Sequence, residues 1–220
     1  IYFSRPDSVI DGQLAYESRL KMGRSLAIEH PVEADIVVGV PDSAIPAAIG
    51  YANESKIPYT EGLIRNRYVG RTFISPNQKL RELGVKTKFN VLNEVVRGQR
   101  IILIDDSIVR GTTTSRVIEM IKDAGAKEIH MRVSSPPITS PCFFGVDMAT
   151  TSELIANKFS VEKIRKVLGA DSLGFLSVNN LKESVNASEN NYCKACFTGD
   201  YPMPVQLDFD KFHLEKIRQK

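Results

Sequence analysis

Four consecutive aliphatic residues, Ile101 to Ile104, lead directly into two aspartates, Asp105 and Asp106. A short apolar run of this kind indicates a strand that is covered on both faces, as in a parallel sheet. The segment 113–124 has apolar residues at helical spacing and is followed by Gly125, which predicts a helix and its C-terminal stop. A strand, a polar turn and a helix in this order form the repeating unit of an α/β domain.

The same unit is expected elsewhere in the chain. The apolar runs predict strands at residues 36–40, 57–64 and 129–133, and a helix at residues 44–54. We therefore predict an α/β fold with a mostly parallel, doubly wound sheet. Ligands bind beyond the carboxyl ends of the strands in such sheets, which points to residues 41–43 and 105–112.

Composition limits the other classes of protein. The chain has 220 residues, of which 42% are hydrophobic and 25% charged, as in an ordinary globular protein. The formal charge of +3 is too small to indicate a nucleic-acid partner on its own. No apolar run is long enough to cross a bilayer and no signal peptide opens the chain, so we expect no membrane partner and a cytoplasmic location. Because the chain starts on the apolar run Ile1, Tyr2, Phe3 without a Met, we expect a fragment that lacks an upstream part.

A long polar connection, residues 65–90, is rich in Lys and Arg. A connection of this length inside a compact domain is a lid, a binding loop or a solvated surface segment. A nucleic-acid patch is disfavoured because few aromatic residues lie between the basic ones. From Thr150 onward the pattern is polar and helical. We expect a core at residues 1–150 with a lid at 65–90, and a helical C-terminal extension at 151–220 that packs on the core.

The turn after the strand at 101–104 suits a ligand with two kinds of polar group. Gly111 allows a tight turn, after which backbone amides and threonine hydroxyls at the start of a helix favour a phosphate. Asp105 and Asp106 fit a neighbouring diol or a Mg²⁺ ion. A ligand with both sugar hydroxyls and phosphate would occupy both parts of the turn. The alternative is that the aspartates only cap the helix.

The three cysteines form a pair and a single residue. Cys193 and Cys196 are separated by two residues, and Cys142 lies far upstream. Such a pair can bind zinc, ligate an iron–sulfur cluster or act as a redox couple, and all three residues can also be free thiols.

The run 101–114 resembles the phosphoribosyl pyrophosphate (PRPP) motif of type I phosphoribosyltransferases. Further blocks in the chain resemble the amidophosphoribosyltransferases in particular: residues 2–8, 40–43, 65–73, 134–137 and 196–199. This resemblance covers nearly the whole chain. It implies the type I phosphoribosyltransferase fold with a flexible lid loop and a helical C-terminal extension. It also implies an enzyme that forms 5-phosphoribosylamine from PRPP and glutamine-derived ammonia, the first committed step of purine nucleotide synthesis.

The resemblance also implies roles for single residues. Asp105 and Asp106 would hold the ribose hydroxyls and Mg²⁺, with Ser43 near the same ion. The loop 107–114 would bind the 5′-phosphate, and the turn 41–43 would face the pyrophosphate. The implied substrate-binding set is Pro41, Asp42, Ser43, Asp105, Asp106, Ser107, Val109, Arg110, Gly111, Thr112 and Thr113. The implied catalytic residues are in the lid: Arg67, Tyr68 and Arg71.

The resemblance extends to cofactors and partners. Cys142, Cys193 and Cys196 would ligate a 4Fe–4S cluster, with the fourth cysteine expected just upstream of Ile1. This cluster would clamp the C-terminal segment and take no part in the transfer. A glutaminase domain, absent from this chain, would supply ammonia from the N-terminal side. Purine nucleotides are expected inhibitors, and a homo-oligomer is expected.

A second function of the same fold is a non-catalytic module that senses PRPP and regulates transcription. Such a sensor would not need the lid at 65–90 and would normally carry a DNA-binding helix pair. The sequence contains the first feature and lacks the second, which favours the enzyme.

Overall fold

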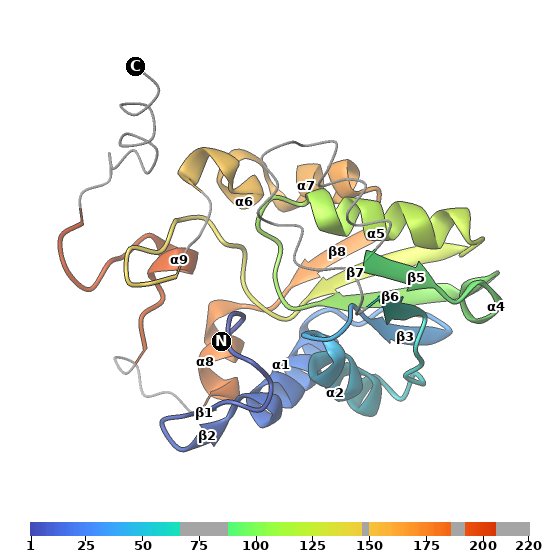
Figure 1. Cartoon of the computed structure of the whole chain (residues 1–220), viewed down its shortest axis with the longest axis horizontal. Helices are drawn as coiled ribbons and strands as arrows, with labels where there is room; N and C mark the ends of the chain where they lie inside the picture. Colours follow the sequence, from blue (N-terminus) through green and yellow to red (C-terminus); the bar gives the residue numbers. More distant parts are fainter. Residues whose placement is uncertain (67–87, 147–149, 186–191, 206–220) are drawn as a thin grey trace.

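A four-stranded parallel sheet forms the centre of the computed structural model, which describes residues 1–66, 88–146, 150–185 and 192–205 (Figure 1). The strand order is β3-β6-β7-β8, and each neighbouring pair is parallel. The strands are β3 (Ile36–Gly39), β6 (Arg100–Asp105), β7 (Glu128–Val133) and β8 (Ser172–Phe175). The predicted α/β class with a parallel sheet is therefore confirmed.

Helices cover both faces of this sheet (Figure 1). One face carries α5 (Thr112–Asp123), α6 (Ile155–Lys158) and α7 (Val161–Leu168), and the other carries α1 (Ala15–Glu29), α2 (Ile45–Ser55) and α8 (Val178–Ser184). The four aliphatic residues from Ile101 to Ile104 have no exposed surface, because β6 lies between two other strands and between two helical layers. This position explains the unbroken apolar run in the sequence.

The order in which the chain adds strands to the sheet reverses between β3 and β6. After β3 it runs through α2 and returns at Tyr59, which forms a parallel bridge with Val37 on the outer side of β3. It then crosses to β6 on the other side of β3 and continues through α5 to β7. The carboxyl ends of β3 and β6 are therefore a topological switch point, where sheets of this type bind ligands.

The strand predicted at residues 57–64 is wrong in extent. Only the bridge at Tyr59 pairs with the central sheet, and Pro58 interrupts the run because it has no backbone donor. The next residues form β4 (Leu63–Arg65), which pairs antiparallel with β5 (Phe89–Val91) outside that sheet. A short helix, α4 (Asn93–Val96), then leads into β6.

The predicted helical extension after residue 150 is wrong at β8, which joins the central sheet beside β7. Its sequence, Ser-Leu-Gly-Phe, contains no β-branched residue and gives little strand signal. The remaining elements of this region are helical: the short 3₁₀ turn η2 (Thr151–Glu153), α6, α7, α8 and α9 (Ala195–Thr198).

The N-terminal part of the chain packs through a close contact between two helices. Before α1 the chain forms a small hairpin of two antiparallel strands, β1 (Val9–Ile10) and β2 (Gln13–Leu14), each two residues long. A Cβ on Gly23 of α1 would lie 1.9 Å from the carbonyl oxygen of Ala47, and a Cβ on Gly50 of α2 would lie 2.1 Å from that of Leu20. Glycine at both positions lets the two backbones approach and fixes how α1 and α2 sit under the sheet.

Among the helices in the described part of the chain, none has the length and apolar character needed to span a bilayer.

Candidate phosphoribosyl site

Two adjacent carboxylates stand at the carboxyl end of β6. Asp105 is 8% exposed, and its Oδ1 accepts the backbone amide of Asp106 at 2.9 Å. Asp106 Oδ1 accepts the Ser107 hydroxyl at 2.8 Å. Burial raises the pKa of Asp105 well above its usual value, and the neighbouring charge of Asp106 raises it further. A partly buried pair of like charges is stabilised by a nearby cation or by hydroxyl groups that donate hydrogen bonds to it.

The turn after this pair delivers an open helix terminus. Gly111 has φ 79°, in the left-handed region, and a Cβ there would lie 2.8 Å from Ile155 Cδ1. α5 starts at the next residue, and its first three amides have no acceptor within the helix because of helix geometry. These amides and the helix dipole together favour an anion.

Hydrogen bonds to Glu153 and Ile155 hold the same turn in place. Arg110 Nε donates to Glu153 Oε1 at 2.9 Å, and the amide of Ile155 donates to the Val109 carbonyl at 2.9 Å. The sequence pattern gave no signal for Glu153, because it is 43 residues from Arg110 along the chain.

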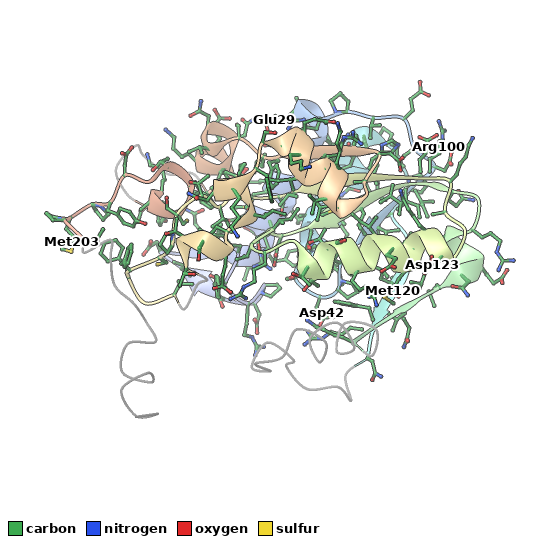
Figure 2. All side chains as sticks on the ribbon, turned by 90° about the horizontal axis from the view of Figure 1, so that it is seen from above. Glu29, Asp42, Arg100, Met120, Asp123 and Met203 are labelled. Atoms are coloured by element: carbon green, nitrogen blue, oxygen red, sulfur yellow. The ribbon has the colours of Figure 1, made fainter. Side chains whose placement is uncertain are left out.

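The loop after β3 lies beside this turn, since β3 and β6 are parallel neighbours. The peptide between Pro41 and Asp42 is cis. Arg65 Nη1 donates to Asp42 Oδ2 at 2.9 Å, which connects the loop 41–43 to the end of β4. Figure 2 shows Asp42 at the side of the molecule that carries α5, well separated from Met203 of the C-terminal segment.

Arg19 of α1 contacts this loop through a hydrogen bond, and the sequence pattern did not reveal this residue either. Its side chain is nearly fully buried, at 2% exposure, and Nη1 donates to the Ser43 carbonyl at 2.9 Å. A single arginine in a helix has no local signature, so only the tertiary structure identifies it.

The structure thus brings the predicted substrate-binding residues together from two strand ends and one helix start. Those from the loop after β3 are Pro41, Asp42 and Ser43, and those from β6 to the first turn of α5 are Asp105, Asp106, Ser107, Val109, Arg110, Gly111, Thr112 and Thr113. The predicted catalytic residues Arg67, Tyr68 and Arg71 lie outside the described residues.

A family model for the phosphoribosyl transferase domain matches residues 22–135, a span that includes both loops. The chain belongs to this family. The expected type I phosphoribosyltransferase fold is thereby confirmed.

Relatives of this phosphoribosyltransferase domain agree on one subgroup. Proteins named amidophosphoribosyltransferase are 59% identical in Archaeoglobus fulgidus, over 93% of this chain and 45% of the relative. In Bacillus subtilis the identity is 54%, over 94% of this chain and 44% of the relative. The chain therefore spans less than half the length of these curated relatives. The resemblance to amidophosphoribosyltransferases is confirmed.

A solved structure gives the same result. The glutamine PRPP amidotransferase from Bacillus subtilis, in complex with ADP and GMP, superimposes with a TM-score of 0.86 at 52% identity. The match covers 97% of this chain and 48% of that chain.

The cysteines of this phosphoribosyltransferase domain lie close to the turn after β6, because Cys142, Cys196 and Val109 pack against the same small apolar cluster. Cys142, Cys193 and Cys196 are free thiols that line one cavity of about 340 Å³, together with Ile1 and Tyr2. Burial raises the pKa of the Cys196 thiol, and the nearness of the other two sulfurs raises it further. Among the described residues, no group of three or more His, Cys, Asp or Glu side chains is arranged to hold a metal ion.

Proposed function

We propose that this chain is the phosphoribosyl-transferring part of an amidophosphoribosyltransferase. Ammonia would displace pyrophosphate from the anomeric carbon of PRPP and give 5-phosphoribosylamine, a step of purine nucleotide synthesis. The observation that carries this proposal is the carboxylate pair Asp105 and Asp106 beside the open start of α5, at the switch point between β3 and β6. The names of the relatives support the same reaction.

The geometry suits each part of PRPP. The carboxylates of Asp105 and Asp106 accept hydrogen bonds from the ribose diol, and the free amides of α5 bind the 5′-phosphate. The loop 41–43 faces the pyrophosphate. Displacement at an anomeric carbon passes through an oxocarbenium-like state, so the protein has to orient the reactants and neutralise the leaving group.

Positive charge for the leaving group would come from the segment between β4 and β5. Arg65 lies at the start of this segment and now pairs with Asp42 of the loop 41–43. Arg67 and Arg71 follow it in the sequence, and Tyr68 would shield the site from water.

A Mg²⁺ ion fits the residues that are present. Ser43, Asp105 and Asp106 supply the oxygen ligands that Mg²⁺ prefers, and a bound cation would offset the burial and the charge of Asp106 that raise the pKa of Asp105. Mg²⁺ usually binds through one or two carboxylates and substrate phosphates, which agrees with a site that is completed only by PRPP. The ion would neutralise charge on the pyrophosphate.

The three thiols that line the cysteine cavity are the donor type of a thiolate-ligated cluster, although their arrangement in this structure does not form a metal site. We propose that Cys142, Cys193 and Cys196 hold a 4Fe–4S cluster with a fourth cysteine that precedes Ile1, since Ile1 lines the same cavity. The cluster would join the C-terminal segment to the rest of the protein. Iron and sulfide analysis of the anaerobically purified whole protein, compared with its Cys196→Ser variant, tests this.

The remaining partners are part of the same proposal. A glutaminase domain in the whole protein would supply the ammonia. Purine nucleotides would inhibit by competing for the phosphoribosyl site, and ADP and GMP in the Bacillus subtilis relative support this. A cytoplasmic homo-oligomer stays a prediction.

The decisive experiment follows pyrophosphate release from PRPP in the presence of Mg²⁺ and ammonium salt at alkaline pH. We expect release that depends on ammonium and disappears in an Asp105→Ala, Asp106→Ala double variant. The matched control is Asp123→Ala, an exposed carboxylate at the other end of α5 (Figure 2), which should keep full activity. Binding of PRPP without release would favour a sensing module, and no binding would refute the site.

A further inference from the structure

Arg19 joins three separate segments of the chain. Its Nη1 donates to the carbonyl oxygen of Ser43 at 2.9 Å, and its Nη2 donates to those of Ile1 at 2.9 Å and Ser4 at 2.8 Å. One guanidinium therefore connects the first residues of the chain to the loop 41–43. The planar, forked arrangement of donors is specific to arginine.

The charge of Arg19 is costly where it lies. The side chain is 2% exposed, and its acceptors in these three bonds are neutral carbonyl oxygens. Burial lowers the pKa of Arg19, while the charge of Asp106 opposes this effect. A buried charge that is satisfied only by neutral groups is disfavoured by desolvation, so a neutral residue would connect these segments at lower cost.

The charge of Arg19 interacts with a carboxylate of the candidate site. Asp105 and Asp106 are two close carboxylates in a partly buried site, and the negative charge of Asp106 acts on the Arg19 guanidinium. Arg19 holds the Ser43 carbonyl, so the position of the loop 41–43 depends on this side chain.

We infer that Arg19 is a positioning residue of the phosphoribosyl site, which fixes the loop 41–43 against the first four residues of the chain. The inference rests on the proposed function for the identity of the ligand. A displacement of residues 1–4 would therefore also move the loop 41–43, which faces the pyrophosphate.

A second buried arginine provides a matched control. Arg132 of β7 is 4% exposed and also donates to neutral groups, namely the carbonyls of His30 and Met131 and the hydroxyl of Ser172. His30 follows the last residue of α1, roughly 16 Å along the helix from Arg19. Arg132→Lys therefore removes the same kind of buried fork without touching either loop of the site.

The experiment compares Arg19→Lys with Arg132→Lys in the whole protein, at a temperature well below both unfolding transitions. Hydrogen exchange in the absence of ligand and calorimetric binding of PRPP with Mg²⁺ are measured on each. For Arg19→Lys we expect faster exchange at residues 1–5 and 41–45 together, and binding of PRPP at least about tenfold weaker. For Arg132→Lys we expect a similar loss of thermal stability and PRPP binding close to that of the unchanged protein.

Equal PRPP affinity in the two variants would overturn the inference and leave Arg19 as a structural residue. Faster exchange at residues 1–5 alone would also overturn it, because the loop 41–43 would then not depend on Arg19. Absence of PRPP binding by the unchanged protein would refute the proposed function instead, and the exchange pattern would still decide whether Arg19 joins the two segments.

Discussion

Asp105 is held in an environment that destabilises its charged form. Burial and the adjacent Asp106 raise its pKa in the folded protein above the usual value for a carboxyl. A carboxyl whose folded pKa is raised binds its proton more tightly in the folded state, so its ionisation at neutral pH lowers the free energy of unfolding. The same charge is what a ribose diol or a cation requires, so stability and binding oppose each other at this residue.

Asp105→Asn should therefore raise the melting temperature of the free protein at neutral pH and weaken binding of PRPP with Mg²⁺ by roughly tenfold or more. Differential scanning calorimetry and titration calorimetry measure the two effects. Asp35→Asn is a control for which we expect the opposite change in melting temperature, because the Arg100 guanidinium lowers the pKa of Asp35 to about 2. That variant should melt at a lower temperature and bind normally. A lower melting temperature for Asp105→Asn would contradict the prediction.

Gly111 is the second residue whose identity is fixed by its position. Gly111→Ala should destabilise the protein by more than about 1–2 kcal/mol, because φ 79° is strained for alanine and the new Cβ would lie 2.8 Å from Ile155 Cδ1. It should also weaken binding of inorganic phosphate or PRPP, since the turn into α5 shifts. Chemical denaturation and calorimetry check both effects.

Gly98→Ala separates the two causes. Gly98 also has a positive φ, 73°, but a Cβ there would meet no atom within 4 Å. This control should lose only the stability that backbone strain costs and should bind phosphate normally. Equal losses of stability in the two variants would show that the contact with Ile155 is unimportant.

At the scale of elements, the packing of α1 against α2 determines where both Arg19 and the loop 41–43 lie. Gly23→Ala should cost about 1–3 kcal/mol of stability, because the backbones would have to separate to clear the carbonyl of Ala47. Since Arg19 lies one turn earlier on α1, the separation should also weaken PRPP binding. Arg24→Ala, on the exposed face of the same helix, should change stability by less than about 0.5 kcal/mol. Denaturant unfolding of both variants tests this, and equal stabilities would refute the close contact.

The elements that the sequence predicted well are those with uninterrupted local patterns. β6 is marked by four adjacent aliphatic residues, and α5 by apolar residues on one face with Gly125 behind it. β8 was missed because Ser172 and Gly174 dilute its pattern, and its place in the sheet depends on pairing with β7. A Cβ on Gly174 would lie 2.6 Å from the His30 ring, so this glycine is required by a tertiary contact that no local pattern reveals.

The same distinction applies to the candidate site. Asp105, Asp106 and Gly111 follow one another along the chain, so a single motif predicts their meeting at one strand end. Arg19 and Glu153 reach the site from α1 and from η2, and their partners are distant in sequence. Contacts of this kind are set by how elements pack, which a single sequence does not specify.

At the scale of the whole molecule, buried polar side chains connect the N-terminal helix to the far edge of the sheet. Arg132 Nε and the Tyr51 hydroxyl both donate to the His30 carbonyl at 2.9 Å, and the His30 ring contacts the Phe175 carbonyl. These bonds join α1, α2, β7 and β8. β8 is thus attached to the core of the fold by side-chain hydrogen bonds as well as by strand pairing.

His130 makes this edge of the sheet sensitive to acid. It lies on β7 at 7% exposure, with Nδ1 at 3.0 Å from the Ser172 hydroxyl and Nε2 at 3.1 Å from Glu128. Burial lowers the pKa of His130 below its usual value of 6.5, and the positive charge of Arg132 lowers it further, although Glu128 opposes both effects. Between the lowered pKa and 6.5 the unfolded chain binds more protons than the folded one, so stability falls as the pH falls through this window.

We therefore expect the melting temperature to hold near neutral pH and to fall as the pH drops below about 6.5. In His130→Gln, whose side chain does not titrate but can still form hydrogen bonds with Ser172 and Glu128, this decline should be shallower. Calorimetric scans of both proteins from about pH 8 to about pH 5.5 measure the difference. The carboxyls contribute to both profiles, so the comparison isolates the histidine. If the melting temperatures of the two proteins fall in parallel with pH, folding does not lower the pKa of His130. The hydrogen bonds between β7 and β8 would then persist with a charged imidazole beside Arg132.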